Sequence, residues 1–89
     1  MYTFSTDENF EREFKKLDKT VRVMITQWIK KHLMDCDNPR AFGKALVGNL
    51  KGYWRYRIGN HRLLAIIKDD ELIIVAVEIE HRKSVYKRK

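Results

Sequence analysis

The middle of this chain lacks acidic side chains. Residues 38–68 contain seven Lys and Arg residues and no Asp or Glu, whereas residues 1–37 carry seven of each sign and residues 69–89 carry five of each. The formal net charge of +7 therefore resides in one contiguous segment. Because a solvated surface normally mixes both signs, a segment without carboxylates indicates a polyanionic partner, with nucleic acid as the first candidate.

Cysteine and long apolar segments are also scarce. The single cysteine, Cys36, forms no internal disulfide, and neither a secreted scaffold nor a zinc site is indicated. The longest apolar run, residues 72–77, is far too short for a membrane span, and acidic residues stand where a signal peptide needs basic and then apolar ones. We therefore expect one cytoplasmic domain over residues 1–89, with no metal or other cofactor.

Apolar spacing predicts two helices in the first half of the chain. Residues 2–4 alternate in the manner of an edge strand, and Ser5 or Thr6 then offers an N-cap for the first helix. Thr20 is the expected N-cap of a second helix that ends before Pro39. The apolar faces of these helices are Phe10, Phe14 and Leu17, and then Val21, Ile25, Trp28, Ile29 and Leu33.

The apolar period changes to two in the second half. Strands are predicted over residues 53–58, 61–67 and 72–79, and Gly59-Asn60 between the first two is a hairpin signal. The third strand is apolar on both faces, which is typical of a central strand. The order β-α-α-β-β-β predicts an α+β domain in which a helical hairpin packs on one face of a small antiparallel sheet.

The predicted hairpin gathers three arginines. A two-residue loop at Gly59-Asn60 sets Arg57 opposite Arg62, and alternation then places Arg55 on the same face. Like charges this close destabilise a sheet, and no local carboxylate offsets them, so a phosphate-binding face is favoured over an inert charged surface. Trp54 and Tyr56 fall on the opposite face and are expected in the core, although base stacking is the alternative.

Polar groups follow the third predicted strand. Strict alternation places Glu78 opposite His61 and away from Arg62, unless a bulge near residues 79–80 changes the register. Beyond it, His81, Arg82 and Tyr86 supply a titratable acid or base, a cation and a phenol. This signal gains weight because the strand is expected to neighbour the one that carries Arg62.

Two motifs together resemble the RelE/ParE superfamily of bacterial toxins. They are Leu50-x-Gly52-x-x-Arg55-x-Arg57-Ile58-Gly59-Asn60-His61-Arg62-Leu63 and Val77-Glu78-Ile79-Glu80-His81-Arg82-Lys83-x-Val85-Tyr86. Length, element order and basic charge agree over nearly the whole chain, and the likeness is stronger to the RelE ribonuclease branch.

The resemblance implies a microbial-ribonuclease-like fold and metal-independent cleavage of mRNA in the ribosomal A site. The 2′-hydroxyl would attack the adjacent phosphate and leave a 2′,3′-cyclic phosphate. The family pattern assigns the catalytic positions to Arg55, Arg57, Arg62, His81, Arg82 and Tyr86. Lys51, Tyr53 and Lys83 are the expected RNA contacts, and the remaining cations Arg40, Lys44 and Lys68 are left to steering or to a solvated surface.

The chain departs from the family pattern at two positions. Glu80 stands where Gly is usual, and Arg55 stands where some members have a Lys proposed as base. Arginine is effectively never deprotonated, so His81 is the favoured acid or base and Glu78 a weaker candidate.

The resemblance also implies partners. An acidic antitoxin of the RelB type would wrap the cationic face, and the toxin alone is expected to be a monomer without membrane contact. The alternatives are a non-enzymatic toxin of the ParE type that acts on DNA gyrase, and a nucleic-acid-binding module without catalysis.

Overall fold

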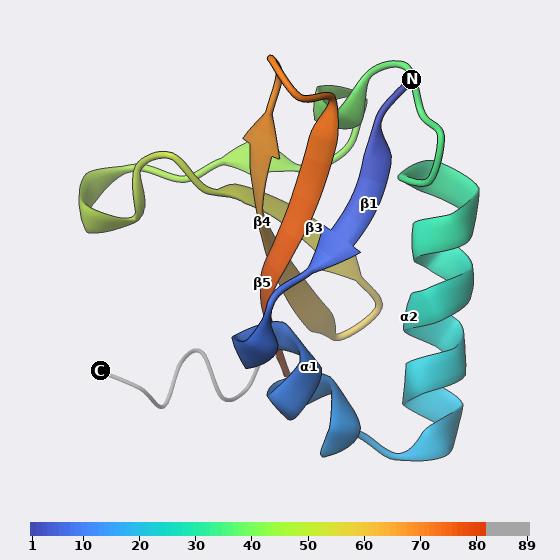
Figure 1. Ribbon diagram of the computed structural model, residues 1–89. Helices are drawn as coiled ribbons and strands as arrows, with labels where there is room; N and C mark the ends of the chain where they lie inside the picture. Colours follow the sequence, from blue (N-terminus) through green and yellow to red (C-terminus); the bar gives the residue numbers. More distant parts are fainter. Residues whose placement is uncertain (82–89) are drawn as a thin grey trace.

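Two helices pack against one face of a five-stranded sheet in the computed structural model, which describes residues 1–81 (Figure 1). The α+β class and the helical pair on one sheet face are as predicted. The elements are β1 (Thr3–Thr6), α1 (Glu8–Lys15), α2 (Lys19–His32), the 3₁₀ turn η1 (Pro39–Ala41), β2 (Lys44–Ala45), the 3₁₀ turn η2 (Gly48–Leu50), β3 (Trp54–Ile58), β4 (His61–Lys68) and β5 (Ile73–His81).

The sheet is mixed, so the prediction of an antiparallel sheet is wrong at one edge. The strand order is β1-β5-β4-β3-β2, and β1 runs parallel to β5 while the other pairs are antiparallel. Alternation along a strand shows which face is buried but says nothing about which strand lies beside it. The two-residue strand β2 was not predicted, whereas β5 is an interior strand, as its apolar faces indicated.

The hairpin between β3 and β4 has the predicted register. Ile58 pairs with His61, Arg57 with Arg62, and Arg55 with Leu64. Gly59 has a φ of 59°, which a residue without Cβ adopts without strain, while Asn60 stays outside the left-handed region. Gly at the first turn position matches a hairpin turn whose twist suits the flanking strands.

Aspartates cap both helices, so the predicted caps at Ser5 or Thr6 and at Thr20 are wrong. The Asp7 carboxylate accepts a hydrogen bond from the Phe10 N–H at 2.9 Å, and Asp18 accepts from the Val21 N–H at 3.3 Å. Thr6 belongs to β1, and Thr20 lies inside the first turn of α2. A carboxylate satisfies the same amide as a hydroxyl and also stabilises the positive end of the helix dipole.

The core lies between α2 and the sheet. Tyr56 is fully buried, as predicted, and its hydroxyl donates to the Pro39 carbonyl at 2.7 Å, which ties η1 to β3. Trp54 is partly buried against this cluster. The buried members are Phe10, Ile25, Ile29, Leu33, Tyr56, Ile58, Leu63, Ala65, Ile74, Ala76 and Ile79. Within residues 1–81, no helix is both long enough and apolar enough to cross a membrane.

A buried histidine pair closes the turn end of the sheet. His61 is 7% exposed, and its ring lies 4.9 Å from the ring of His81 on β5. Burial, together with the nearby His81, lowers the pKa of His61 below its ordinary value of 6.5, while Asp18 acts in the opposite direction. The fold therefore favours the neutral form of His61.

The capping assignment predicts unequal effects for two substitutions in the first turn of α2. Asp18→Ala is expected to lower the free energy of unfolding by about 1 kcal/mol, because the Val21 N–H loses its acceptor. Thr20→Ala is the matched control and is expected to change stability by less than about 0.5 kcal/mol. Denaturant unfolding measures both, and a larger loss for Thr20→Ala would contradict the assignment.

The histidine pair predicts a pH-dependent stability. As pH falls below 6.5, the unfolded chain takes up a proton that folded His61 resists, so the free energy of unfolding decreases toward the lower folded pKa. The stabilisation that neutral His61 gives to the folded state is complete above the pKa of the unfolded chain and is lost on acidification. Denaturant unfolding between about pH 7.5 and about pH 5 is expected to show a flatter profile for His61→Phe. An unchanged slope in that variant would argue against the assignment.

Candidate nucleic-acid interface

The sheet face opposite the helices carries the three hairpin arginines, and we call it the arginine face. Arg57 and Arg62 are direct cross-strand partners, and Arg55 lies two residues from Arg57 on β3. Tyr56 and Ile58 alternate with them and point into the core. The predicted grouping of Arg55, Arg57 and Arg62 on one face is thus confirmed by the strand register.

The three arginines differ in surroundings. Arg57 is exposed and Arg55 is half-buried. The Arg62 side chain is 21% exposed, and its Nη2 lies 3.2 Å from Oε2 of Glu80 on β5. No carboxylate of residues 38–68 offsets the arginine repulsion, as the sequence indicated, but Glu80, an acid distant in sequence, becomes the neighbour of Arg62.

The sequence analysis noted Glu80 only as a departure from the family pattern and did not predict its pairing with Arg62. The last strand was predicted to end at residue 79, but β5 continues to His81, so Glu80 is a strand residue paired with Arg62. The alternation of Glu78 and Glu80 is the signal that could have extended the strand prediction. The Glu80 side chain is 8% exposed, so the ion pair is largely shielded from water.

Glu78 also lies on the arginine face, which corrects its predicted position. A bulge displaces the register of β4 and β5 between Leu64 and Ala65, and Glu78 consequently pairs with Leu64 instead of His61. Leu64 is itself 2% exposed, although it stands on the side of the sheet away from the core cluster. The face therefore combines cations, two carboxylates and one buried apolar side chain.

His81 is on the other side of the sheet. Its Cα pairs with His61, which in turn pairs with Ile58 on the helix-covered face. β5 does neighbour the strand of Arg62, as predicted, but the pleat separates the His81 ring from the arginines. The acid or base role of His81 stays a prediction from the sequence, and the position of the residue does not support it.

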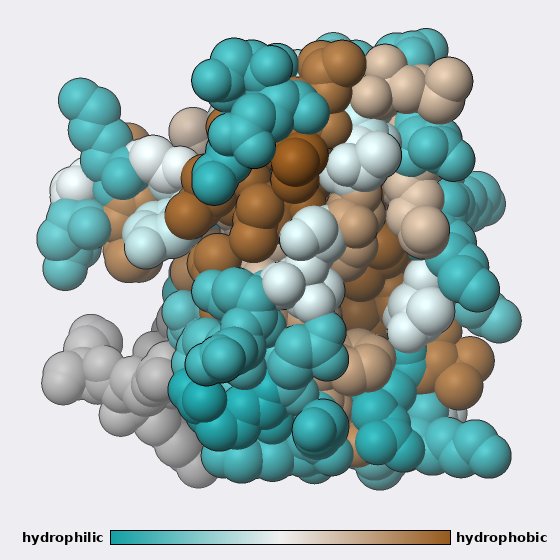
Figure 2. Space-filling model, in the orientation of Figure 1, coloured by the Kyte–Doolittle hydropathy of each residue, from teal (hydrophilic) through white to brown (hydrophobic). Residues whose placement is uncertain are grey.

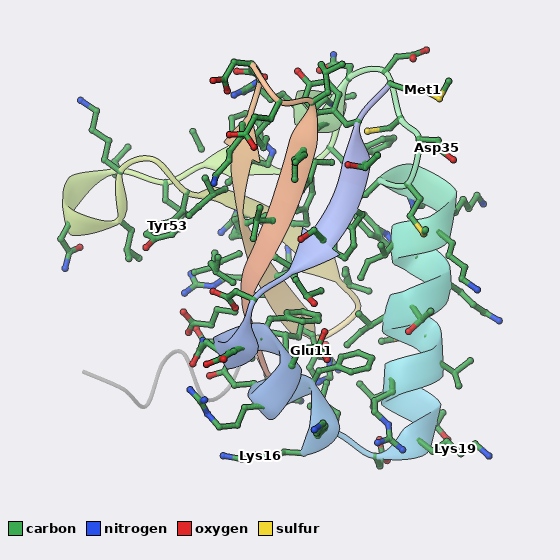
Figure 3. All side chains as sticks on the ribbon, viewed as in Figure 1. Met1, Glu11, Lys16, Lys19, Asp35 and Tyr53 are labelled. Atoms are coloured by element: carbon green, nitrogen blue, oxygen red, sulfur yellow. The ribbon has the colours of Figure 1, made fainter. Side chains whose placement is uncertain are left out.

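The expected RNA contacts are only partly covered by the described residues. Lys51 is exposed in the turn after η2, and Tyr53 is half-buried directly before β3, beside the projecting η2 segment (Figure 3). Arg82, Lys83 and Tyr86 lie outside residues 1–81, so their predicted roles stay predictions.

Arg40 forms an ion pair with Asp69 and is therefore not an unpaired cation. Its guanidinium contacts both carboxylate oxygens of Asp69, at 2.9 and 3.1 Å, and the Tyr2 hydroxyl donates to the same carboxylate at 2.6 Å. These contacts lower the pKa of Asp69, with the Arg40 hydrogen bonds as the main cause. Arg40 thus ties η1 to the loop after β4, a pairing that the sequence analysis did not predict.

The chemistry that this face supports is anion binding. Guanidinium groups bind phosphate oxygens through paired N–H donors, and three of them lie on two adjacent strands. Across residues 1–81, no group of three or more His, Cys, Asp or Glu side chains is arranged to hold a metal ion.

Comparisons with known proteins agree on one superfamily. The family model described as "ParE toxin of type II toxin-antitoxin system, parDE" matches residues 5–86. Toxin RelG of Mycobacterium tuberculosis is 28% identical over 87 residues, with 98% of each chain covered.

Solved structures give the same result. A chain of the RelBE2 toxin-antitoxin complex from Mycobacterium tuberculosis has a TM-score of 0.83 and 27% identity, with 91% of each chain covered. The isolated E. coli RelE toxin has a TM-score of 0.70 at 19% identity, with 98% of this chain and 93% of that chain covered, and thus shares the fold. The chain therefore belongs to the RelE/ParE superfamily and is a toxin of a type II toxin-antitoxin system.

Proposed function

We propose that this toxin is a ribosome-dependent mRNA endoribonuclease that inhibits translation. The 2′-hydroxyl of the substrate attacks the adjacent phosphate, and the 5′ oxygen of the next nucleotide leaves, which produces a 2′,3′-cyclic phosphate. The observation that carries this proposal is the direct pairing of Arg57 with Arg62 next to Arg55, on a sheet face away from the core. The reaction class comes from the likeness to RelE toxins in sequence motifs and fold.

Charge stabilisation is the main contribution that this face offers. The reaction passes through a phosphorane with two negative charges, and preorganised donors at such a site usually supply the largest share of catalysis. Arg57 is exposed and accessible to a backbone phosphate, while Arg55 and Arg62 are half-buried and held by the sheet. Arg82 and Tyr86 are proposed to complete the site on the basis of the family pattern alone.

Proton transfer is assigned differently from the sequence interpretation. A guanidinium does not accept a proton, and His81 lies on the far side of the pleat from Arg62. Glu78 is brought to the arginine face by the bulge and is our candidate for the group that receives the 2′-hydroxyl proton. Positioning of the mRNA by the ribosome would supply much of the remaining rate enhancement.

The rival function is inhibition of DNA gyrase by a non-enzymatic toxin, which the ParE description of the matching family favours. Primer extension on mRNA from translating extracts separates the possibilities. Codon-registered cuts support the ribonuclease. DNA damage with intact mRNA supports the gyrase inhibitor, and neither result supports a binding module without catalysis.

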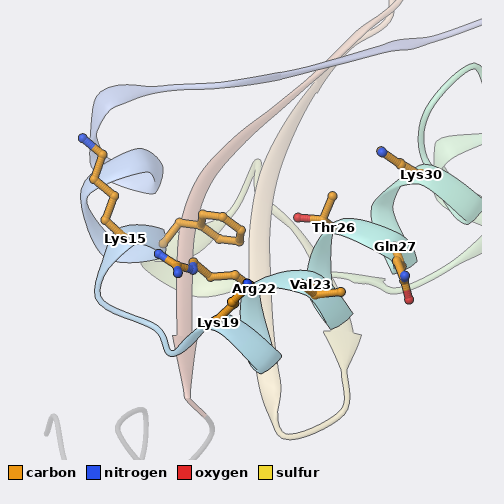
Figure 4. Close-up of a pocket in the computed structure, with 8 residues that line it drawn as sticks. Lys15, Lys19, Arg22, Val23, Thr26, Gln27 and Lys30 are labelled. Atoms are coloured by element: carbon orange, nitrogen blue, oxygen red, sulfur yellow. The ribbon is translucent and has the colours of Figure 1, made fainter.

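Partner binding is proposed to involve a groove between the helices as well as the arginine face. Phe14, Thr26 and Lys30 line two adjoining hollows of about 480 and 210 Å³. Apolar side chains gather between β1 and α2 (Figure 2), and cations from α1 and α2 line the larger hollow (Figure 4). The rim cations are Lys15, Lys19, Arg22 and Lys30.

Such a groove suits an acidic amphipathic segment of the antitoxin. Apolar residues of the partner would fill the floor, and its carboxylates would meet the lysines of the rim. Structures of related toxins with RelB-type antitoxins support the class of partner. The position of the contact is our inference from the groove.

Loss of one arginine is the direct test of the ribonuclease proposal. Arg57→Ala is expected to reduce codon-registered cleavage in a translating extract by about 10²- to 10³-fold, because one donor to the developing charge is lost. The variant should fold normally, since Arg57 is exposed. Lys68→Ala also removes one positive charge, at the end of β4 far from Arg62, and this variant is expected to cleave mRNA normally. Full cleavage by Arg57→Ala would refute the proposed role.

The groove predicts a charge-dependent association with the antitoxin. Lys30→Glu is expected to slow association by about tenfold, because electrostatic steering by the rim is reversed. Lys31→Glu is the matched control, since Lys31 is also exposed on α2 but does not line either hollow. Stopped-flow measurements at low and high salt should show a difference that shrinks with salt. Equal effects of the two variants would place the contact elsewhere.

A further inference from the structure

The Arg62–Glu80 ion pair occupies the position where the proposed reaction needs a phosphate. The two residues are direct partners on β4 and β5, and the contact joins Arg62 Nη2 to Glu80 Oε2 at 3.2 Å. Exposure is 21% for the arginine side chain and 8% for the glutamate side chain. The pair is therefore a fixed feature of the sheet and not a contact between two mobile surface groups.

The atom that Glu80 contacts decides how Arg62 meets other anions. A guanidinium offers two-point binding either through Nε and Nη2 or through Nη1 and Nη2, and Nη2 belongs to both edges. Nη2 carries two N–H donors, one on each edge, and Glu80 occupies one of them. The contact thus blocks two-point binding on one edge of Arg62, and the negative charge of the carboxylate weakens phosphate binding on the other edge until the carboxylate leaves.

The second donor of the same edge is left without a partner. Arg62 Nε is buried and donates to no acceptor within residues 1–81, although Nη2 beside it is bound. A buried donor without an acceptor destabilises the free protein. Arg62 is consequently better matched to an anion that bridges Nε and Nη2 than to a carboxylate bound at Nη2 alone.

We propose that Glu80 is an internal substitute for the RNA phosphate at Arg62, and that RNA binds fully only when the Glu80 carboxylate is displaced. This inference rests on the proposed function, since it names the group with which the substrate competes. It concerns the binding of RNA to the arginine face and makes no claim about the proton transfer.

Competition follows from the connectivity of the sheet. Glu80 is held beside Arg62 by the β4–β5 register, so its effective concentration at the guanidinium is high, and an incoming phosphate must overcome it. In the free protein the same carboxylate offsets the repulsion between Arg62 and its cross-strand partner Arg57. Glu80 therefore stabilises the toxin before RNA arrives and weakens the binding of RNA afterwards.

Binding of uncleavable RNA tests the proposal. The probe is a fluorescent single-stranded RNA whose 2′-hydroxyls are methylated, which removes the nucleophile. Glu80→Gln is expected to bind this probe about tenfold more tightly than the wild type, and to steepen the dependence of log K on log salt by about 0.7, which corresponds to one additional phosphate contact. Glu71→Gln makes the same change of charge at an exposed position and is expected to bind like the wild type.

A double substitution shows whether the gain acts through Arg62. Arg62→Ala with Glu80→Gln removes both charges, leaves no carboxylate buried alone, and is expected to bind no more tightly than the wild type. Circular dichroism and thermal unfolding confirm that each variant is folded. Wild-type affinity in Glu80→Gln, an equal gain in Glu71→Gln, or a gain retained in the double variant would each overturn the proposal.

Cleavage measured in parallel keeps the two proposals apart. Tighter binding by Glu80→Gln supports the competition even if no variant cleaves mRNA in a translating extract, in which case the ribonuclease proposal fails alone. Codon-registered cleavage by the wild type without any change of RNA affinity in Glu80→Gln overturns the competition and leaves the ribonuclease in place.

Discussion

The pairing register of β3, β4 and β5 is the constraint on which the candidate site depends. Gly59-Asn60 sets Arg57 opposite Arg62, and the bulge beside Leu64 then sets Glu78 and Glu80 on the same side. A slip of one residue in either pair would exchange arginines for core residues such as Tyr56. Burial of the core face therefore fixes the side of the sheet on which the arginines lie.

Charges in this protein are paired between residues that are close in space and distant in sequence. The segment without acids suggested seven unopposed cations, but Asp69 binds Arg40 and Glu80 binds Arg62 in the folded chain. Both acids lie beyond the segment in sequence. Among the hairpin arginines, Arg57 is the exposed one, so it is the cation most accessible to a polyanion at this face.

Apolar periodicity predicted much of the fold. The departures from periodicity determine which side chains surround the arginines. The helices, the hairpin and the interior position of β5 all follow from apolar spacing. The parallel pairing of β1, the bulge beside Leu64 and the extension of β5 to His81 depend on contacts between distant segments, which a local pattern does not encode. For this reason Glu78 lies on the side opposite to its predicted one and His81 is separated from the arginines, which themselves lie where predicted.

The separation of His81 from the arginines bears on how this toxin would work. A ribonuclease with a tuned acid and base on one face needs little help, whereas the arginine face combines three guanidiniums with Glu78 and Glu80, and His61 and His81 lie on the other side of the sheet. The rate enhancement at such a site depends most on a substrate that the ribosome has already bent and aligned. An internal carboxylate at Arg62 adds to this dependence, because a phosphate held in place by the ribosome displaces Glu80 more readily than one on free RNA. Low activity on free RNA would then be a consequence of the sheet register itself.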